Sequence, residues 1–188
     1  NCGSGCMVPE IYELLAESQR SYLVAAAGCG KTQEIARAVA VSPGRQLVLT
    51  HTHAGVNSLR RRLKALRVPE SKYHVDTIAG WALRYAASFP TLSGLTDTIP
   101  TGNAWSAVYS AATALLERSA VKRVVDASYA GLYVDEYQDC TLSQHKLILR
   151  LADVLPCRVL GDPLQGIFGF QNDPLVDWDQ DIAPSFQC

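Results

Sequence analysis

The stretch SYLVAAAGCGKT, residues 21–32, decides how this chain folds. Four residues of β-strand character lead into small residues and then into the motif residues Gly28, Gly30, Lys31 and Thr32. Residues 33–41 continue with helical periodicity. A strand, a tight loop and a helix start in this order are typical of a phosphate-binding loop, whose backbone N–H groups surround an anion. The lysine then reaches the terminal phosphates and the threonine hydroxyl can ligate Mg²⁺; a glycine-rich turn with an incidental lysine is the alternative.

Length and composition are those of a globular protein. The 188 residues suffice for one substantial domain or for one domain that carries a small insertion. No segment approaches the roughly 20 apolar residues that span a bilayer, and no signal peptide is visible, so we expect a cytoplasmic protein without a membrane partner. The net charge of −1 gives no global basic field, although a local basic patch would suffice to bind nucleic acid.

The cysteines and the first residues carry little functional information. Six cysteines, at positions 2, 6, 29, 140, 157 and 188, match no zinc-binding spacing, and we interpret them as buried or incidental thiols. Cys29 is notable only because it lies inside the phosphate-binding loop. Residues 1–6 differ in character from the rest, and we interpret them as a cloning remnant.

Strands alternate with helices along the chain. Predicted strands cover residues 22–26, 46–50, 73–77, 131–134 and 157–160. Predicted helices cover residues 9–18, 31–40, 51–66, 77–87, 103–118 and 141–155, with a further short helical run near 126. This alternation predicts an α/β fold with a parallel sheet flanked by helices, and places ligands at the carboxyl ends of the strands.

The domain organisation follows from a break in that alternation. Residues 89–128 form a small helical insertion, beginning with a loop over 89–102, between two parts of one main domain, residues 7–88 and 129–188. The helix over residues 51–66 has a buried face and a basic remainder, Arg60, Arg61, Arg62, Lys64 and the following Arg67. That basic run is either a solvated helix face or a footprint for a phosphate backbone.

Two further strand ends carry residues suited to nucleotide chemistry. Asp135 follows an apolar strand and would hold Mg²⁺, while Glu136 is placed to orient or deprotonate an attacking water. A surface acidic turn is the alternative for this pair. Gln165 follows the next strand, where a neutral amide can contact the γ-phosphate. Phe170 lies in a glycine-rich turn and is suited either to core packing or to stacking on a nucleobase.

Five segments in order resemble motifs I, Ia, Ib, II and III of the UvrD/Rep-like superfamily 1A DNA helicases. The segments are residues 25–32 (AAAGCGKT), 49–53 (LTHTH), 76–81 (DTIAGW), 134–139 (VDEYQD) and 160–170 (LGDPLQGIFGF). The DExQD form of motif II and the GDxxQxI-aromatic form of motif III are the most diagnostic. One departure is His51, which stands where this family usually has phenylalanine.

The resemblance implies a RecA-like P-loop NTPase domain, the first such domain (1A) with a reduced 1B insertion, which uses ATP and Mg²⁺. It implies that Thr32 and Asp135 bind the metal and that Glu136 is the catalytic base, assisted by Lys31 and by Gln165 as γ-phosphate sensor. The implied nucleotide-binding residues are Ala27, Gly28, Cys29, Gly30, Lys31, Thr32 and Gln165. The residues that match DNA-contacting positions are Thr50, His51, Thr77 and Phe170.

The resemblance also implies a function. We expect the motor domain of an ATP-driven helicase that moves along single-stranded DNA, or DNA with a single-stranded tail, and unwinds it. The second RecA-like domain with arginine fingers would come from the remainder of the same polypeptide, so the isolated chain should hydrolyse ATP poorly. The alternatives are a helicase-like NTPase that regulates or senses nucleic acid without unwinding, for instance in phage defence, and a small-molecule kinase that shares only the loop.

Overall fold

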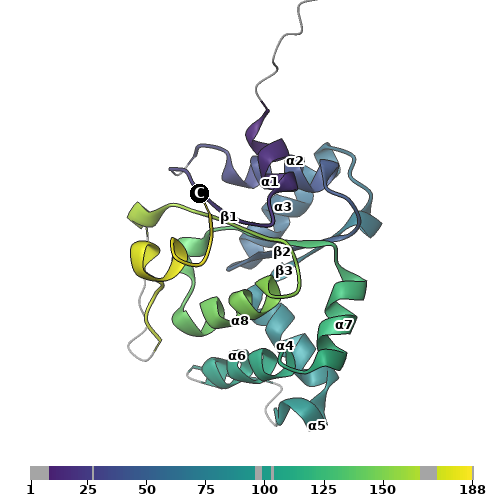
Figure 1. Ribbon diagram of the computed structural model, residues 1–188, viewed down its shortest axis with the longest axis vertical. Helices are drawn as coiled ribbons and strands as arrows, with labels where there is room; N and C mark the ends of the chain where they lie inside the picture. Colours follow the sequence, from purple (N-terminus) through teal and green to yellow (C-terminus); the bar gives the residue numbers. More distant parts are fainter. Residues whose placement is uncertain (1–8, 27, 96–98, 103, 166–172, 188) are drawn as a thin grey trace, which may run out of the picture.

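A parallel sheet forms the centre of the computed structural model (Figure 1), which describes residues 9–26, 28–95, 99–102, 104–165 and 173–187. Its strands are β1 (Arg20–Val24), β2 (Gln46–Thr50), β3 (Tyr73–Thr77), β4 (Gly131–Val134) and β5 (Cys157–Gly161). They lie in the order β1-β5-β4-β2-β3, and every pair of neighbours is parallel. The α/β class and the RecA-like parallel sheet are therefore confirmed.

The sheet is buried on both faces because helices cover each of them. All residues of β2, β4 and β5 are buried, as expected for parallel strands between two helical layers. Successive residues of β2 alternate between the layers: Leu47 and Leu49 join one apolar cluster, and Val48 joins the other. The strands β2, β3 and β4 have the ends that the sequence predicts.

Helices α1, α2 and α3 cover one face. They span α1 (Ile11–Glu17), α2 (Lys31–Val41) and α3 (His53–Ala65). Ile35 and Val39 of α2 pack in one cluster with Leu59 and Leu63 of α3. Thr52 caps α3 because its side chain accepts a hydrogen bond from the backbone N–H of Gly55 at 3.0 Å. Figure 1 shows these three helices above the sheet.

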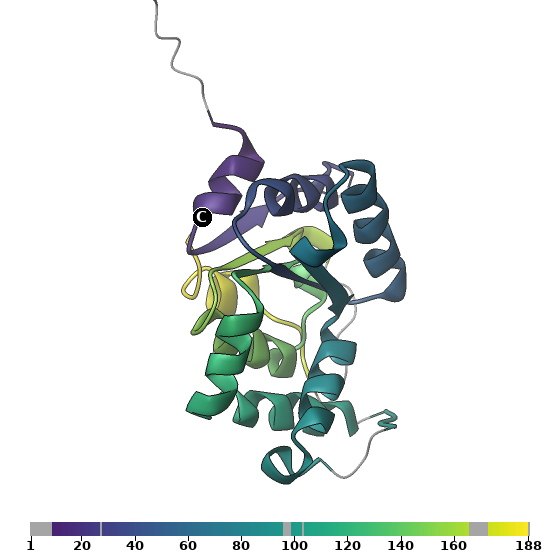
Figure 2. The same ribbon diagram turned by 90° about the vertical axis from the view of Figure 1, so that its right-hand side faces the viewer.

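The remaining helices cover the opposite face, as Figure 2 also shows. They span α4 (Ile78–Ser88), α5 (Pro90–Ser93), α6 (Ala104–Leu115), α7 (Ser119–Ser128) and α8 (Leu142–Ala152). Trp81 of α4, Val108 of α6 and Leu147 of α8 belong to one apolar cluster with Leu132 of β4. Among the described residues, no helix is long and apolar enough to cross a bilayer.

The predicted loop at 89–102 is wrong over its first turn, because residues 90–93 form the short helix α5. Pro90 suits a first helical position and Gly94 ends the helix with a φ of 65°. The next helix, α6, packs against α4 and α8 and so shares the core of the sheet. The division of the chain at residues 89 and 128 stays a prediction.

The first strand is Arg20–Val24 and not the predicted 22–26. The predicted start of the last long helix also differs, because a capping side chain sets it: α8 begins at Leu142 after Thr141. Thr141 and Gln144 exchange side-chain hydrogen bonds with each other's backbone N–H groups, which fixes that start. Three 3₁₀ turns, η1 (Glu70–Lys72), η2 (Tyr137–Asp139) and η3 (Pro163–Gln165), and a π-helical turn, η4 (Trp178–Ile182), complete the described elements.

Candidate active site

The loop between β1 and α2 has the backbone that its glycines predict. Gly28 and Gly30 have φ values of 78° and 83°, in the left-handed region that L side chains rarely adopt. A Cβ on either residue would meet no atom within 4 Å, so conformation rather than crowding favours glycine there. Gly30 is the N-cap of α2, and the first N–H groups of a helix are available to an anion. Cys29 is exposed, and Ala27 lies outside the described residues.

Lys31 holds a positive charge inside the protein, with only 6% of the residue exposed. Its Nζ donates a hydrogen bond to the carbonyl oxygen of Ala25 at 2.9 Å and lies 3.9 Å from Oε2 of Glu136. A buried ammonium group requires such partners to offset its desolvation. The charge is therefore fixed between the phosphate-binding loop and the acidic residues after β4.

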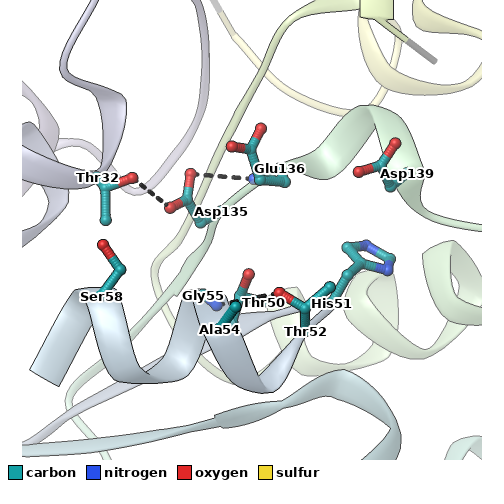
Figure 3. A pocket seen from close by; sticks show the side chains of 10 residues that line it. All are labelled: Thr32, Thr50, His51, Thr52, Ala54, Gly55, Ser58, Asp135, Glu136 and Asp139. Carbon is teal, nitrogen blue, oxygen red and sulfur yellow. Dashed lines mark hydrogen bonds between the residues drawn. The ribbon is translucent and has the colours of Figure 1, made fainter. Parts of the chain in front are cut away.

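Thr32 and Asp135 meet although 103 residues separate them in the chain. The Thr32 hydroxyl donates to Oδ2 of Asp135 at 2.9 Å, and the backbone N–H of Glu136 donates to Oδ1 at 3.0 Å. Figure 3 shows the two side chains pointing toward one another, with α3 beneath them. Burial of Asp135, together with the charge of Glu136, raises the pKa of the Asp135 carboxyl to about 6. A hydroxyl and a desolvated carboxylate form an oxygen donor set of the kind that Mg²⁺ prefers.

Glu136 is held in an unusual conformation beside this pair. Its φ of 55° and ψ of 45° place a residue with a side chain in the left-handed region, which is uncommon outside functional turns. Its side chain is 42% exposed, and the side-chain amide of Gln138 donates to its Oε2 at 2.9 Å. The carboxylate is thus oriented yet reachable by water.

Gln138 connects Glu136 to the end of β5. Its side-chain oxygen accepts a hydrogen bond from the backbone N–H of Asp162 at 2.9 Å, while its amide holds Glu136. Sequence reasoning missed this positioning role, because the amide lies outside the two acidic residues that chemistry singled out. Its place two residues after Glu136, within the DExQD segment, is the signal that could have found it.

A cavity of about 300 Å³ opens between the acidic residues and the start of α3 (Figure 3). Its lining residues are Thr32, Thr50, His51, Thr52, Ala54, Gly55, Ser58, Asp135, Glu136 and Asp139. Two of the residues expected to contact nucleic acid, Thr50 and His51, therefore share a cavity with the residues expected to bind metal. The residues predicted to bind metal and two of those predicted to contact nucleic acid therefore lie around one cavity.

His51 is neutral in this setting. Its Nε2 lies 3.3 Å from Sγ of Cys140, and burial lowers the pKa of the imidazole to about 4. Thr77 does not line the cavity; its side chain accepts a hydrogen bond from the N–H of Gly80 at 2.9 Å and caps α4. His51 follows β2 and Thr77 is the last residue of the neighbouring β3, and the expected contacts of both residues with nucleic acid stay predictions.

The residues expected near the γ-phosphate are only partly described. Gln165 ends η3 on the surface, where its backbone N–H donates to the carbonyl of Asp162 at 3.0 Å, and its side chain does not line the cavity. Phe170 lies outside the described residues. The expected role of Gln165 as sensor therefore stays a prediction.

Comparison with known families agrees with the motifs. The profile of the UvrD/REP helicase N-terminal domain matches residues 104–174, which include Asp135, Glu136 and Gln165. A search of curated proteins found no match. The profile match and the RecA-like parallel sheet both support the resemblance of this chain to the UvrD/Rep-like helicases.

Proposed function

We propose that this chain is an ATP-binding and ATP-hydrolysing motor domain that couples hydrolysis to translocation along single-stranded DNA and to unwinding. The observation that carries the proposal is the hydrogen bond between Thr32 and Asp135, which joins the phosphate-binding loop to the strand end that carries Glu136. A surface acidic turn would have no reason to be buried against a hydroxyl of that loop.

The residues of this site fit Mg²⁺ because Asp135 is 2% exposed and its carboxyl is desolvated next to Glu136. A bound cation would offset the cost of keeping that carboxylate ionised. Thr32 and Asp135 would hold the ion, which supplies charge neutralisation of the nucleotide phosphates. Lys31 would bind those phosphates from the loop side, exchanging the Ala25 carbonyl for a phosphate oxygen.

Glu136 would act on the attacking water. Its carboxylate accepts a proton as the water oxygen bonds to the γ-phosphorus and the bond to the β–γ bridging oxygen breaks. Gln138 would keep that carboxylate in place through its amide, 2.9 Å away. The cavity shared with Thr50 and His51 gives nucleic acid a route to influence the same acidic residues.

The test uses two lysines that donate to backbone carbonyls. Lys31→Ala should abolish binding of Mg²⁺–ATP in calorimetry, whereas Lys72→Ala should not, since Lys72 donates to Ala40 away from the site. Glu136→Gln should keep nucleotide affinity and lose turnover. In a longer polypeptide that contains this chain together with a second RecA-like domain, single-stranded DNA should raise the rate of ATP turnover. Absence of both DNA stimulation and strand displacement in that protein would refute the helicase function.

A further inference from the structure

A second, larger groove lies along the outer side of α3. Its volume is about 630 Å³, and its walls are α3, the 3₁₀ turn η1 and the edge strand β3. The lining residues are Asn57, Arg60, Arg61, Lys64, Glu70, Tyr73, His74 and Val75. Tyr73 begins β3, so the groove reaches toward the amino end of that strand, whereas the catalytic cavity includes Thr50 at the carboxyl end of β2.

One face of α3 supplies three cations to this groove. Residues 57, 60, 61 and 64 have the spacing of a single helical face. Arg60 is fixed, because its Nη2 donates to the backbone carbonyl of Val75 at 2.9 Å. Arg61 and Lys64 are exposed and form no ion pair within the described part of the chain. Glu70 is the one carboxylate among the described lining residues.

Charged side chains of both signs surround His74, which lines this groove. Partial burial lowers the pKa of this imidazole, and the charges of Arg84, Arg45 and Arg60 lower it further. Asp76 ion-pairs with Arg84 and lies 3.8 Å from Nε2 of His74, so it offsets part of this positive charge. The positive charge that lines the groove itself therefore comes from Arg60, Arg61 and Lys64.

The groove and the catalytic cavity border the same helix. Ala54, Gly55 and Ser58 in the first turns of α3 line the cavity, and Asn57 on the adjacent face begins the groove. A nucleic-acid strand that passes the carboxyl end of β2 can therefore continue along the outer face of α3. Among the described lining residues, polar and charged side chains predominate, which suits a ligand held by charge rather than by apolar burial.

We propose that this groove binds the phosphate backbone of a nucleic-acid strand, as a second contact surface separate from the carboxyl ends of the strands. The proposal rests on the proposed function, because it takes the occupant to be the same nucleic acid. Guanidinium and ammonium groups of Arg61 and Lys64 would contact phosphate oxygens, with no discrimination among bases.

The test measures binding of a labelled 20-nucleotide oligo(dT) to the whole chain by fluorescence anisotropy, without nucleotide. R61A/K64A should weaken binding about tenfold at 0.2 M salt and on the order of 70-fold at 0.05 M, because two phosphate contacts contribute a salt slope of about 1.4 on single strands. The variant R61K should retain most of the affinity and the slope, since it keeps the charge.

The matched control is R123A/K146A, which removes an exposed arginine of α7 and an exposed lysine of α8 on the opposite face of the sheet. It should leave affinity and salt slope near the wild-type values. If both double variants weaken oligonucleotide binding equally, the effect is one of general charge and the proposal that this groove binds nucleic acid is refuted. Wild-type affinity in R61A/K64A would also refute the groove proposal, and it would leave the proposed function standing. Failure of the wild type to bind the oligonucleotide would overturn both.

Discussion

Replacing Asp135 by asparagine should stabilise the metal-free protein at neutral pH while it removes the carboxylate that we propose as a metal ligand. Asp135 is 2% exposed, and burial with the neighbouring Glu136 charge raises its pKa from 3.8 to about 6. Asparagine keeps both hydrogen bonds: its oxygen accepts from the N–H of Glu136, and its amide donates to the Thr32 hydroxyl. Only the buried charge is lost.

The size of the effect follows from the pKa difference. A rise of roughly two units corresponds to about 3 kcal/mol of cost for the ionised carboxylate in the folded state. The folded protein binds this proton more tightly than the unfolded chain, so wild-type stability falls as pH rises from about 4 to about 6. Above that range the cost is constant. Asp135→Asn should therefore exceed the wild type by about 3 kcal/mol at pH 7.5 and match it near pH 4.

Urea unfolding with a chelator present, at a series of pH values, measures this difference. Other titrating groups affect both proteins alike, so the difference between them isolates Asp135. Adding Mg²⁺ with ATP should then stabilise the wild type and leave the variant unchanged. A variant less stable than the wild type at pH 7.5, or a difference that does not change with pH, would refute the electrostatic reasoning.

Two other predictions concern the neighbouring groups. His51 should stay neutral in an NMR titration down to about pH 5, since burial lowers its pKa to about 4. Because the unfolded chain binds this proton more tightly, the His51 contribution lowers the free energy of unfolding as pH falls below 6.5, whereas the Asp135 contribution raises it. A titration midpoint near 6.5 would contradict the burial of His51. Gly161→Ala should cost about 1–3 kcal/mol of unfolding free energy, because the new Cβ would lie 2.8 Å from both Oε1 of Gln138 and the ring of Trp178. Wild-type stability of that variant in urea unfolding would show that these neighbours yield freely.

The parts of the fold that sequence could predict are those set by local pattern. Strands such as β2 and β4 are short apolar runs between turn residues, and burial on both faces leaves them few alternative ends. The phosphate-binding loop is equally local, because glycine at 28 and 30 reports a backbone conformation directly. Asp135 and Glu136 could be singled out because they follow such a strand.

The parts that sequence could not predict depend on contacts between distant segments. The short helix α5 begins at a proline within a stretch whose turn residues suggested a loop. The basic residues of α3 left two explanations open, because their partner surface is β3, whose position at the sheet edge comes from strand order. Gln138 has no chemistry of its own to attract attention, and its role appears only when the ends of β4 and β5 are seen together.

Strand order also explains how the parts of the site can act on one another. Because β5 lies between β1 and β4, its last residue, Gly161, accepts a hydrogen bond from the N–H of Ala25 in the phosphate-binding loop at 3.1 Å. The next residue, Asp162, donates to Gln138, which in turn holds Glu136. A shift at the end of β5 therefore cannot occur without moving the loop or the acidic pair. The segment that leaves this point carries Gln165, so a γ-phosphate contact there would be connected through the backbone and the Gln138 amide to Glu136, the carboxylate that we propose activates the water.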